Sequence, residues 1–312
     1  MADKEGVIRC LRQAAATETA AGRASWGIAL EGYASKIERR RTFDDKLLVL
    51  LQPKGEQAPS LKAFETRIAT KGLQDIILSP QNEEEIKTLL LEQKNQEQLA
   101  AHQLEPRRKI LLIGPPGSGK TLLAEILAKE TGKTFHILRM GQLMDSLLGN
   151  TVRNIENSFA AIAHCDGVFL FDEFDALGSA RDDKADVNEM RRALNSILIC
   201  LENTGGTSLI IAATNHPKTL DKAFRRRFDS ILEFHQPSDA ERNILIKKTL
   251  EEHRFSSPEL QAELLKATEG LSFDETKNTT LKTLVDAIIH NKAPDASTAH
   301  KQNHTRKKLA GD

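Results

Sequence analysis

An apolar run that leads into a glycine-rich turn and then a helical pattern is the feature that most constrains the fold. Residues 110–128 read ILLIGPPGSGKTLLAEILA, in which four apolar residues predict a buried strand and the segment after Lys120 predicts a helix. The turn Gly114–Thr121, GPPGSGKT, fits the pattern G-x-x-x-x-G-K-[ST] between a strand and a helix. A glycine-rich turn with an incidental lysine is the simpler alternative, but the strand and helix around it favour a phosphate-binding loop.

The residue types of this loop match the chemistry of a bound triphosphate. Glycines let backbone N–H groups turn inward around phosphates, and the N-terminus of the following helix adds partial positive charge. Lys120 is expected to reach the β- and γ-phosphates, and the Thr121 hydroxyl is expected to bind Mg²⁺. The predicted nucleotide-binding residues of the loop are Gly114, Pro115, Pro116, Gly117, Ser118, Gly119, Lys120 and Thr121.

Two acidic residues follow a second apolar run, Val168–Phe171. Side chains at the carboxyl end of a strand lie in the crevice where α/β sheets bind ligands. We therefore expect Asp172 to hold Mg²⁺ and Glu173 to orient and polarise an attacking water as the base. Two acids after a strand are by themselves a common surface turn, and the upstream phosphate loop favours the functional interpretation. Asp175 is expected to be structural.

Short apolar runs alternate with helical stretches from about residue 71 onward, which is typical of βαβ units and a parallel sheet. The expected strands are Ile110–Ile113, Phe135–Leu138, Val168–Phe171, Ser208–Ala212 and Ser230–Phe234. The expected helices among them are Glu83–His102, Thr121–Glu130, Val152–Ala163 and Val187–Leu201. The fold class predicted is therefore α/β, with a doubly wound parallel five-stranded sheet.

The pattern changes at both ends of this α/β region. Trp26, Leu30, Tyr33 and Ile37 have helical spacing, which favours the core of a helical bundle over a partner groove. Past Pro237 only amphipathic helical segments remain, and the last residues have no apolar periodicity. We expect four parts: a helical recruitment module over 1–70, a large α/β domain over 71–236, a small helical domain over 237–291, and a disordered tail over 292–312. The expected helices of the small domain are Ala240–His253, Pro258–Ala267 and Phe273–His290.

Composition excludes several classes of protein. Lys plus Arg equals Asp plus Glu at 44 each, so no global field attracts nucleic acid or an acidic membrane surface. No apolar run approaches the roughly 18 residues that a membrane span needs, and the first residues lack a signal-peptide pattern. The three cysteines are widely spaced without a CxxC pair, so we expect packing residues rather than a metal site. These features predict a soluble, cytoplasmic protein.

Three segments together resemble the AAA ATPase family: GPPGSGKT, FLFDEFDAL at 169–177 and IIAATNHPKTLDKAFRRRFD at 210–229. They occur in that family's order and extend the resemblance over about residues 75–235. The resemblance implies a P-loop NTPase with strand order 5-1-4-3-2, Mg-dependent hydrolysis of ATP, and a lid domain after residue 237.

The resemblance also implies roles for individual residues. Asn215 matches the polar sensor of the γ-phosphate or water, although an asparagine there could equally cap a turn. Arg226 and Arg227 match arginine fingers that reach a neighbouring subunit's ATP, which implies a homo-oligomeric ring, usually a hexamer; the alternative is a basic turn with no neighbour. Asp75, Ile76 and Leu122 resemble the positions that enclose the adenine. The expected catalytic residues are Lys120, Glu173, Asn215, Arg226 and Arg227.

Two positions depart from the family pattern. Leu147-Leu148-Gly149 stands where a pore loop usually carries an aromatic residue, and Phe273 stands where a small residue usually approaches the nucleotide. We expect ATP turnover coupled to the remodelling of a protein partner. The alternative is a nucleotide-controlled scaffold that licenses an effector such as a subtilisin-like serine protease, which the leucine pair slightly favours. A nucleic-acid loader is disfavoured, because there is no basic stripe and only 4% of residues are aromatic.

Overall fold

The computed structural model describes residues 64–140, 151–177, 184–216, 222–291 and 293–296, together with Arg12. The chain divides into two compact units, residues 1–58 and 59–312, and every described residue except Arg12 belongs to the second unit. The Trp26 stripe, the Leu147-Leu148-Gly149 segment and the tail beyond Ala296 lie outside the described residues.

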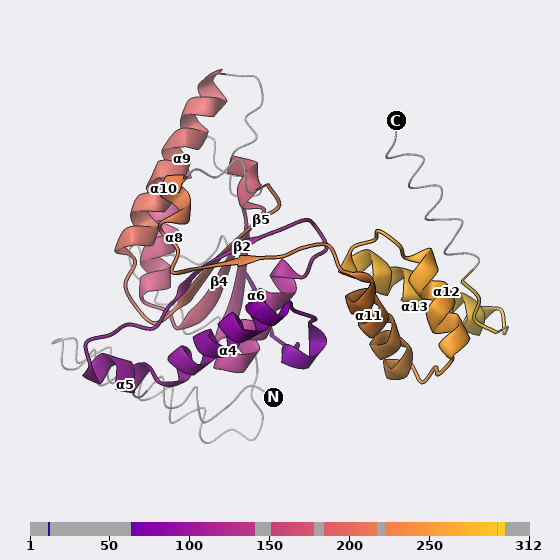
Figure 1. Cartoon of the computed structure of the whole chain (residues 1–312). Helices are drawn as coiled ribbons and strands as arrows, with labels where there is room; N and C mark the ends of the chain where they lie inside the picture. Colours follow the sequence, from indigo (N-terminus) through magenta and orange to yellow (C-terminus); the bar gives the residue numbers. More distant parts are fainter. Residues whose placement is uncertain are drawn as a thin grey trace. The chain divides into compact units, whose positions relative to one another are not determined.

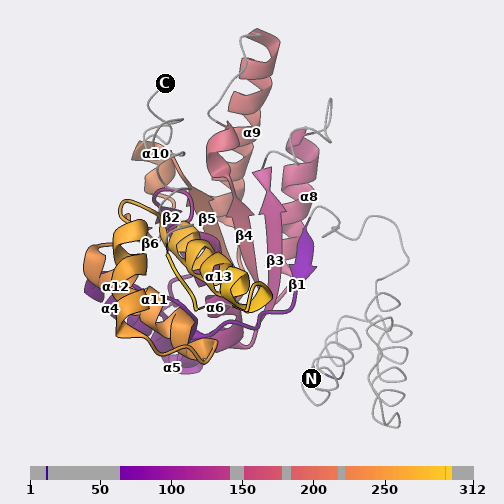
Figure 2. The same ribbon diagram turned by 90° about the vertical axis from the view of Figure 1, so that its right-hand side faces the viewer.

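A six-stranded sheet forms the centre of the second unit (Figure 2). Its strands are β1 (Glu65–Arg67), β2 (Lys109–Ile113), β3 (Thr134–Arg139), β4 (Gly167–Asp172), β5 (Leu209–Thr214) and β6 (Ser230–Glu233). They stand in the order β1-β3-β4-β5-β2-β6, in which β2 to β6 are parallel and β1 is antiparallel to β3. Counted from β2, the five parallel strands have the order 5-1-4-3-2, so the strand that leads into the phosphate loop lies inside the sheet.

Strand β1 contradicts two expectations. The sheet has six strands instead of five, and residues 65–67 form a strand although a helical segment was expected up to residue 70. The three residues of β1 are all exposed and show no apolar alternation. The segment is held instead by Phe64, whose ring lies edge-on to Phe169 and Phe171 at centroid distances of 5.2 and 5.7 Å. A single buried phenylalanine next to three polar residues gives no periodic pattern that would predict a strand.

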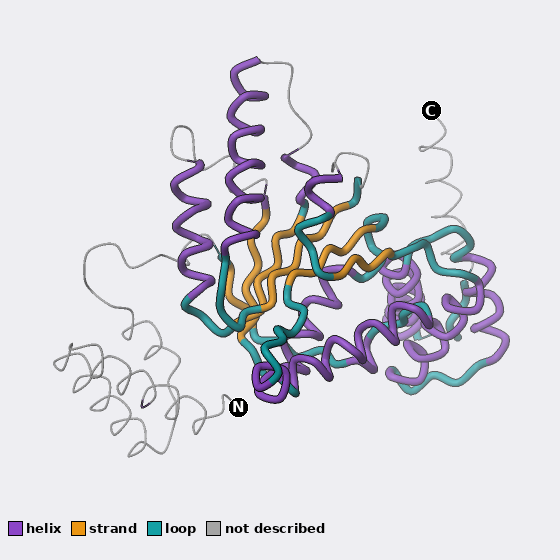
Figure 3. Tube along the Cα trace, turned by 60° about the vertical axis from the view of Figure 1, so that its left-hand side comes forward, coloured by secondary structure: helices purple, strands orange, loops and turns teal. Residues whose placement is uncertain are grey.

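Helices cover both faces of the sheet (Figures 1 and 3). One face packs against α4 (Pro80–Lys94) and α6 (Lys120–Thr131), and the other packs against α8 (Thr151–Ala163) and α9 (Lys184–Asn203). Side chains of β2 alternate between these two faces. Ile110 and Leu112 belong to the hydrophobic cluster on the side of α4 and α6, whereas Leu111 and Ile113 belong to the cluster on the side of α8 and α9. Burial on both faces explains why the central strands read as continuous apolar runs.

The expected helix Glu83–His102 is two helices. The first, α4, begins earlier at Pro80, because the Ser79 hydroxyl accepts the Asn82 N–H and proline suits the first helical position. It ends at Lys94, and α5 (Gln96–Ala101) follows after Asn95. The Asn95 side-chain amide donates to the Leu91 carbonyl at 2.7 Å, the kind of local bond by which asparagine competes with helix continuation.

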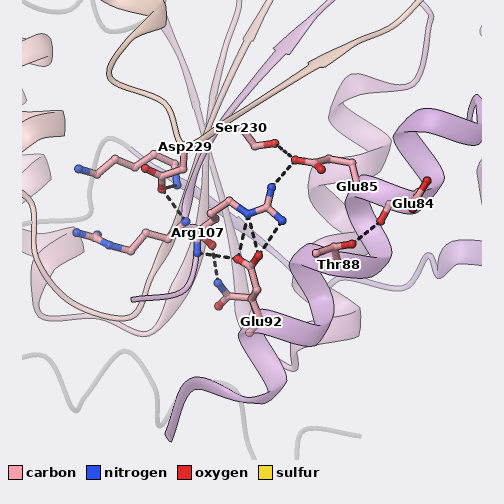
Figure 4. Close-up of polar contacts among 10 residues, drawn as sticks. Glu84, Glu85, Thr88, Glu92, Arg107, Asp229 and Ser230 are labelled. Carbon is pink, nitrogen blue, oxygen red and sulfur yellow. Dashed lines mark hydrogen bonds and ion pairs between the residues drawn. The ribbon is translucent and has the colours of Figure 1, made fainter. Parts of the chain in front are cut away.

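A polar cluster fastens α4 to the strand ends remote from the phosphate loop (Figure 4). The Arg107 guanidinium donates to Glu92 Oε1 at 2.9 Å and to Glu85 Oε1 at 2.5 Å. Glu85 also accepts the Ser230 hydroxyl, which joins the helix to the first residue of β6. Asp229 Oδ2 accepts the Lys109 N–H at 2.9 Å. These bonds fix α4 against β2 and β6, so the short segment before α4 has a defined place beside the sheet.

The C-terminal helices are α11 (Asp239–Glu252), α12 (Pro258–Ala267) and α13 (Phe273–Ile289), and α11 packs against both of the others. They enclose their own buried cluster, which includes Ile246, Leu264 and Leu284. Ala296 is also buried in this cluster, so the expectation that all residues from 292 onward are disordered was wrong at this position. One small residue carries no periodicity that would have predicted its burial. No helix in the described part of the chain is long and apolar enough to cross a membrane.

Candidate active site

A cavity of about 370 Å³ lies where β2, β4 and β5 end. Its walls come from six parts of the chain: the loop Pro116–Leu122, Asp172 and Glu173 at the end of β4, Asn215 after β5, the segment Asp75–Ile77, helix α11 and helix α13. The carboxyl ends of parallel strands meet at one edge of the sheet, which explains why residues so far apart in sequence share one cavity.

The phosphate loop depends on backbone conformations that only glycine adopts freely. Gly114 has a φ of 155° and Gly119, which precedes the first residue of α6, has a φ of 102°. A Cβ atom at Gly114 would also lie 2.5 Å from the carbonyl oxygen of Phe234. The loop can therefore wind tightly from β2 into α6, whose N-terminal N–H groups then face the cavity.

Lys120 is buried in the wall of the cavity and has only 7% of its surface exposed. Its Nζ donates to the carbonyls of Gly114 and Pro115 at 2.8 Å each and to Asn215 Oδ1 at 2.9 Å. Burial lowers the pKa of the ammonium, and the nearby carboxylates of Asp172 and Asp175 act against that shift. The bonds fix where the charge of Lys120 lies, at the centre of the loop.

Thr121 and Asp172 bring two oxygen groups together beside the loop. The Thr121 hydroxyl donates to Asp172 Oδ2 at 2.9 Å, and Asp172 Oδ1 accepts the Glu173 N–H at 2.9 Å. Hydroxyl and carboxylate oxygens are ligands that suit Mg²⁺. These two residues therefore fit a magnesium site.

Glu173 has a left-handed backbone conformation with a φ of 56°. Such a conformation is uncommon outside glycine and costs about 1 kcal/mol or more. The side chain is exposed and lines the cavity next to Asp172. A carboxylate held there can accept a proton from a water molecule above the phosphate loop.

Asp175 links the turn after β4 to the end of β5. Its Oδ1 accepts the Asn215 N–H at 3.0 Å and the Thr214 hydroxyl at 3.2 Å. The sequence indicated a structural residue, and the structure identifies what it supports: the backbone that positions Asn215 against Lys120. The position of Asp175 in the sequence could not identify these two partners, because they lie at the end of β5, about 40 residues further along the chain.

Arg226 and Arg227 lie outside the lining of the cavity. They follow the short helix α10 (Lys222–Arg225). Arg226 is exposed, whereas Arg227 Nη1 lies 2.7 Å from Glu202 Oε1 of α9. The structure therefore brings the other predicted site residues together within one chain and leaves the two arginines apart from them.

The remaining wall of the cavity is partly apolar. Asp75, Ile76 and Leu122 line it. Sequence reasoning missed Leu245 and the α13 side chains of Asp274 and Lys277 and singled out Phe273 only as a departure; all four line the cavity. Their helices were predicted from periodicity, but periodicity does not say which face meets a site on another part of the chain.

Comparisons with known proteins agree with this geometry. Residues 110–236 match the family described as "ATPase family associated with various cellular activities (AAA)". An uncharacterized AAA family ATPase of Sinorhizobium fredii is 42% identical over 166 residues, which cover 53% of this chain and 50% of that protein. A putative 26S proteasome regulatory subunit homolog of Methanothermobacter marburgensis is 31% identical over 197 residues, 62% of this chain and 53% of that protein.

A solved structure shares the fold. The crystal structure of the FIGL-1 AAA domain superposes with a TM-score of 0.59 at 21% identity, covering 80% of this chain and 81% of that chain. The chain spans about half the length of the curated relatives described above.

Proposed function

We propose that this chain, whose residues 110–236 form an ATPase domain of the AAA family, binds ATP with Mg²⁺ and hydrolyses it. One observation carries the proposal. A buried lysine ammonium, a threonine–aspartate oxygen pair and an asparagine amide converge in one cavity at the end of a parallel sheet. A triphosphate with a divalent cation is the ligand class that needs all three groups.

The residues divide the work of phosphoryl transfer. Lys120 binds the phosphate chain, and the loop N–H groups orient it. Thr121 and Asp172 would hold Mg²⁺, which when bound neutralises charge on the phosphate oxygens. Glu173 orients the attacking water and takes its proton, and Asn215 fixes the position of Lys120 and of the water. Asp75, Ile76 and Leu122 enclose the adenine.

The hydrolysis test is Glu173→Gln. The variant should bind ATP with unchanged affinity while phosphate release falls about 100-fold or more, because the amide cannot accept the proton. Glu263→Gln, an exposed glutamate on α12, is the matched control and should hydrolyse ATP at the rate of the unaltered chain. Full turnover by Glu173→Gln would contradict the role of that carboxylate.

We further propose that the chain acts as a homo-oligomeric ring, with a hexamer as the expected size. The exposure of Arg226 outside its own cavity supports a role at a neighbouring subunit's nucleotide. A mixture of Arg226→Ala and Glu173→Gln chains should recover hydrolysis that neither variant has alone, since an intact finger then meets an intact glutamate. A mixture that remains at the rate of the separate variants would count against sharing.

Within this ring, ATP turnover is proposed to remodel a protein partner that the N-terminal unit recruits in the cytoplasm, with the C-terminal helices acting as a lid. The proteasome-regulatory name of a relative supports a protein as the partner. A scaffold that licenses an effector such as a protease is the second candidate, favoured by Leu147-Leu148-Gly149 in place of an aromatic pore loop. ATP-dependent unfolding of a protein captured by Glu173→Gln supports remodelling; an effector whose activity follows bound nucleotide, without unfolding, supports the scaffold.

A further inference from the structure

The chain between β1 and α4, residues 68–79, contributes to the cavity although it has almost no regular structure. The turn Leu73–Asp75 is its one regular element. Backbone N–H and C=O groups outside helices and sheets need other partners. Because Asp75–Ile77 line the cavity, the contacts that hold this segment decide the shape of that wall.

Glu125 of α6 holds the first part of the segment by its backbone. Its Oε1 accepts the Thr70 N–H at 3.0 Å, the Thr70 hydroxyl at 3.2 Å and the Lys71 N–H at 3.3 Å. Lys129 lies one turn further along α6, and its Nζ donates to the Thr70 carbonyl at 2.7 Å. Helix α6 therefore supplies, through side chains, the partners that a neighbouring strand would supply in a sheet.

The same helix joins this anchor to the phosphate loop. Glu125 lies one turn after Leu122, which lines the cavity, and α6 begins at Lys120. The far end of the segment also meets the loop, because a Cβ atom at Gly119 would lie 3.6 Å from Ile76 Cδ1, an ordinary van der Waals contact. One helix thus carries the phosphate loop and the anchor of the wall beside it.

Apolar packing alone defines the position of this segment less sharply. Its side chains that pack against the hydrophobic cluster on the side of α4 and α6 are only half-buried: Ala69, Leu73, Ile76 and Leu78. Hydrophobic burial is non-directional, whereas hydrogen bonds to one oxygen fix both distance and direction. The bonds to Glu125 therefore determine where the backbone of the segment lies.

We propose that Glu125 is a positioning residue for the base-binding wall: by holding Thr70 and Lys71, it places Asp75–Ile77 where the adenine of the nucleotide meets them. This role rests on the proposed ATP site, and Glu125 itself does not line the cavity. Recognition is thereby divided, since the phosphate loop binds the phosphates and the anchored segment binds the base. Loss of the anchor weakens only ligands that carry a base.

The experiment measures the affinities of the full chain for MgADP and for magnesium pyrophosphate, which lacks the base, by competition with a fluorescent adenine nucleotide. Glu125→Ala should bind MgADP about tenfold more weakly, the loss expected if the segment keeps its binding position about a tenth of the time, and should bind pyrophosphate unchanged. Glu125→Gln keeps an oxygen acceptor and should stay within about threefold of the unaltered chain for MgADP. Glu263→Ala, at an exposed position of α12, is the matched control and should change neither affinity.

Hydrogen exchange gives a second readout on the segment itself. The amides of Thr70 and Lys71 donate to Glu125, so they should exchange faster in Glu125→Ala than in the unaltered chain. Exchange of Leu111 in the buried strand β2 should stay the same. Equal exchange of the two segment amides in both proteins would overturn the anchor.

The outcomes separate this role from the proposed function. No binding of MgADP by the unaltered chain would refute the ATP site itself. Unchanged MgADP affinity in Glu125→Ala, or an equal loss for pyrophosphate, would overturn only the role of Glu125. If pyrophosphate binds too weakly to compete, adenosine replaces it and must weaken by the same factor as MgADP; a smaller loss would overturn the role. Should Glu125→Ala fail to fold, judged by its circular dichroism, Glu125→Leu fills more of the same space without an acceptor and allows the same comparison.

Discussion

Asp175 offers the sharpest test of how the site is held together, because one carboxylate oxygen joins the turn after β4 to the end of β5. Asp175 Oδ1 accepts both the Asn215 N–H and the Thr214 hydroxyl. Asp175→Ala removes this acceptor from both donors. The loss matters most for the Thr214 hydroxyl, because that side chain is fully buried. The end of β5 then loses the contact that sets the Asn215 amide against Lys120.

The magnitude follows from the two bonds. A hydrogen bond to a charged acceptor contributes about 1.5–3 kcal/mol, and two bonds that share one oxygen are less than additive. We therefore expect Asp175→Ala to lower the free energy of unfolding by about 2–4 kcal/mol. Asp175→Asn keeps an oxygen acceptor without the charge and should cost about 1 kcal/mol. ATP turnover should fall at least about tenfold in Asp175→Ala, because Asn215 and Lys120 lose their fixed geometry.

Urea denaturation followed by circular dichroism measures the stability change, and phosphate release measures turnover. Stability and turnover should both decrease in the order unaltered chain, Asp175→Asn, Asp175→Ala. An unfolding free energy of Asp175→Ala within about 0.5 kcal/mol of the unaltered chain, together with unaltered turnover, would refute the proposed support of β5 by this carboxylate.

Three further changes test other contacts by denaturation at equilibrium. Arg227→Ala should lower the free energy of unfolding by about 0.5–1 kcal/mol through loss of its partly exposed ion pair, whereas the exposed Arg226→Ala should leave it unchanged; equal values would contradict this difference. Gly114→Ala should cost about 2 kcal/mol or more and weaken ATP binding, because its Cβ meets the Phe234 carbonyl; unchanged stability would argue against that clash. Burial lowers the pKa of His136 in the folded chain. As the pH falls, His136 is therefore protonated in the unfolded chain, at its ordinary pKa near 6.5, before it is protonated in the folded chain. Stability from this site is fully present above that pH and falls as pH drops toward the lowered folded pKa; the fall between pH 7.5 and 5.5 should be smaller in His136→Phe, and an identical fall would exclude the histidine as its source.

The sequence predicted the parallel sheet and the phosphate loop well, because both leave local signals. Strands buried on both faces read as apolar runs, and the observed β3 and β4 extend the expected runs by one residue at each end. Loop residues such as Lys120 and Thr121 are adjacent in sequence and act together. Their shared chemistry could therefore be inferred before any contact was known.

Contacts between distant segments could not be predicted in this way. The Asp274 N–H donates to the Gly117 carbonyl although the two residues lie far apart in the sequence. The residue pattern of neither segment indicates that it contacts the other. The same holds for Asp175, whose partners lie on β5, and for Phe64, whose burial depends on aromatic rings of β4. These residues stabilise the site through tertiary contacts, which sequence periodicity does not encode.

The short strand β1 has a consequence for the solubility of shortened forms of this protein. Without it, the six-residue β3, with four of its side chains buried, would present an open row of backbone N–H and C=O groups at the rim of the sheet. Long apolar edge strands of this kind pair with other chains and cause aggregation. A three-residue edge strand with an exposed Glu65–Arg67 ion pair offers little backbone for such pairing. A fragment that begins at residue 69 is thus expected to precipitate, and one that begins at residue 59 keeps its rim protected.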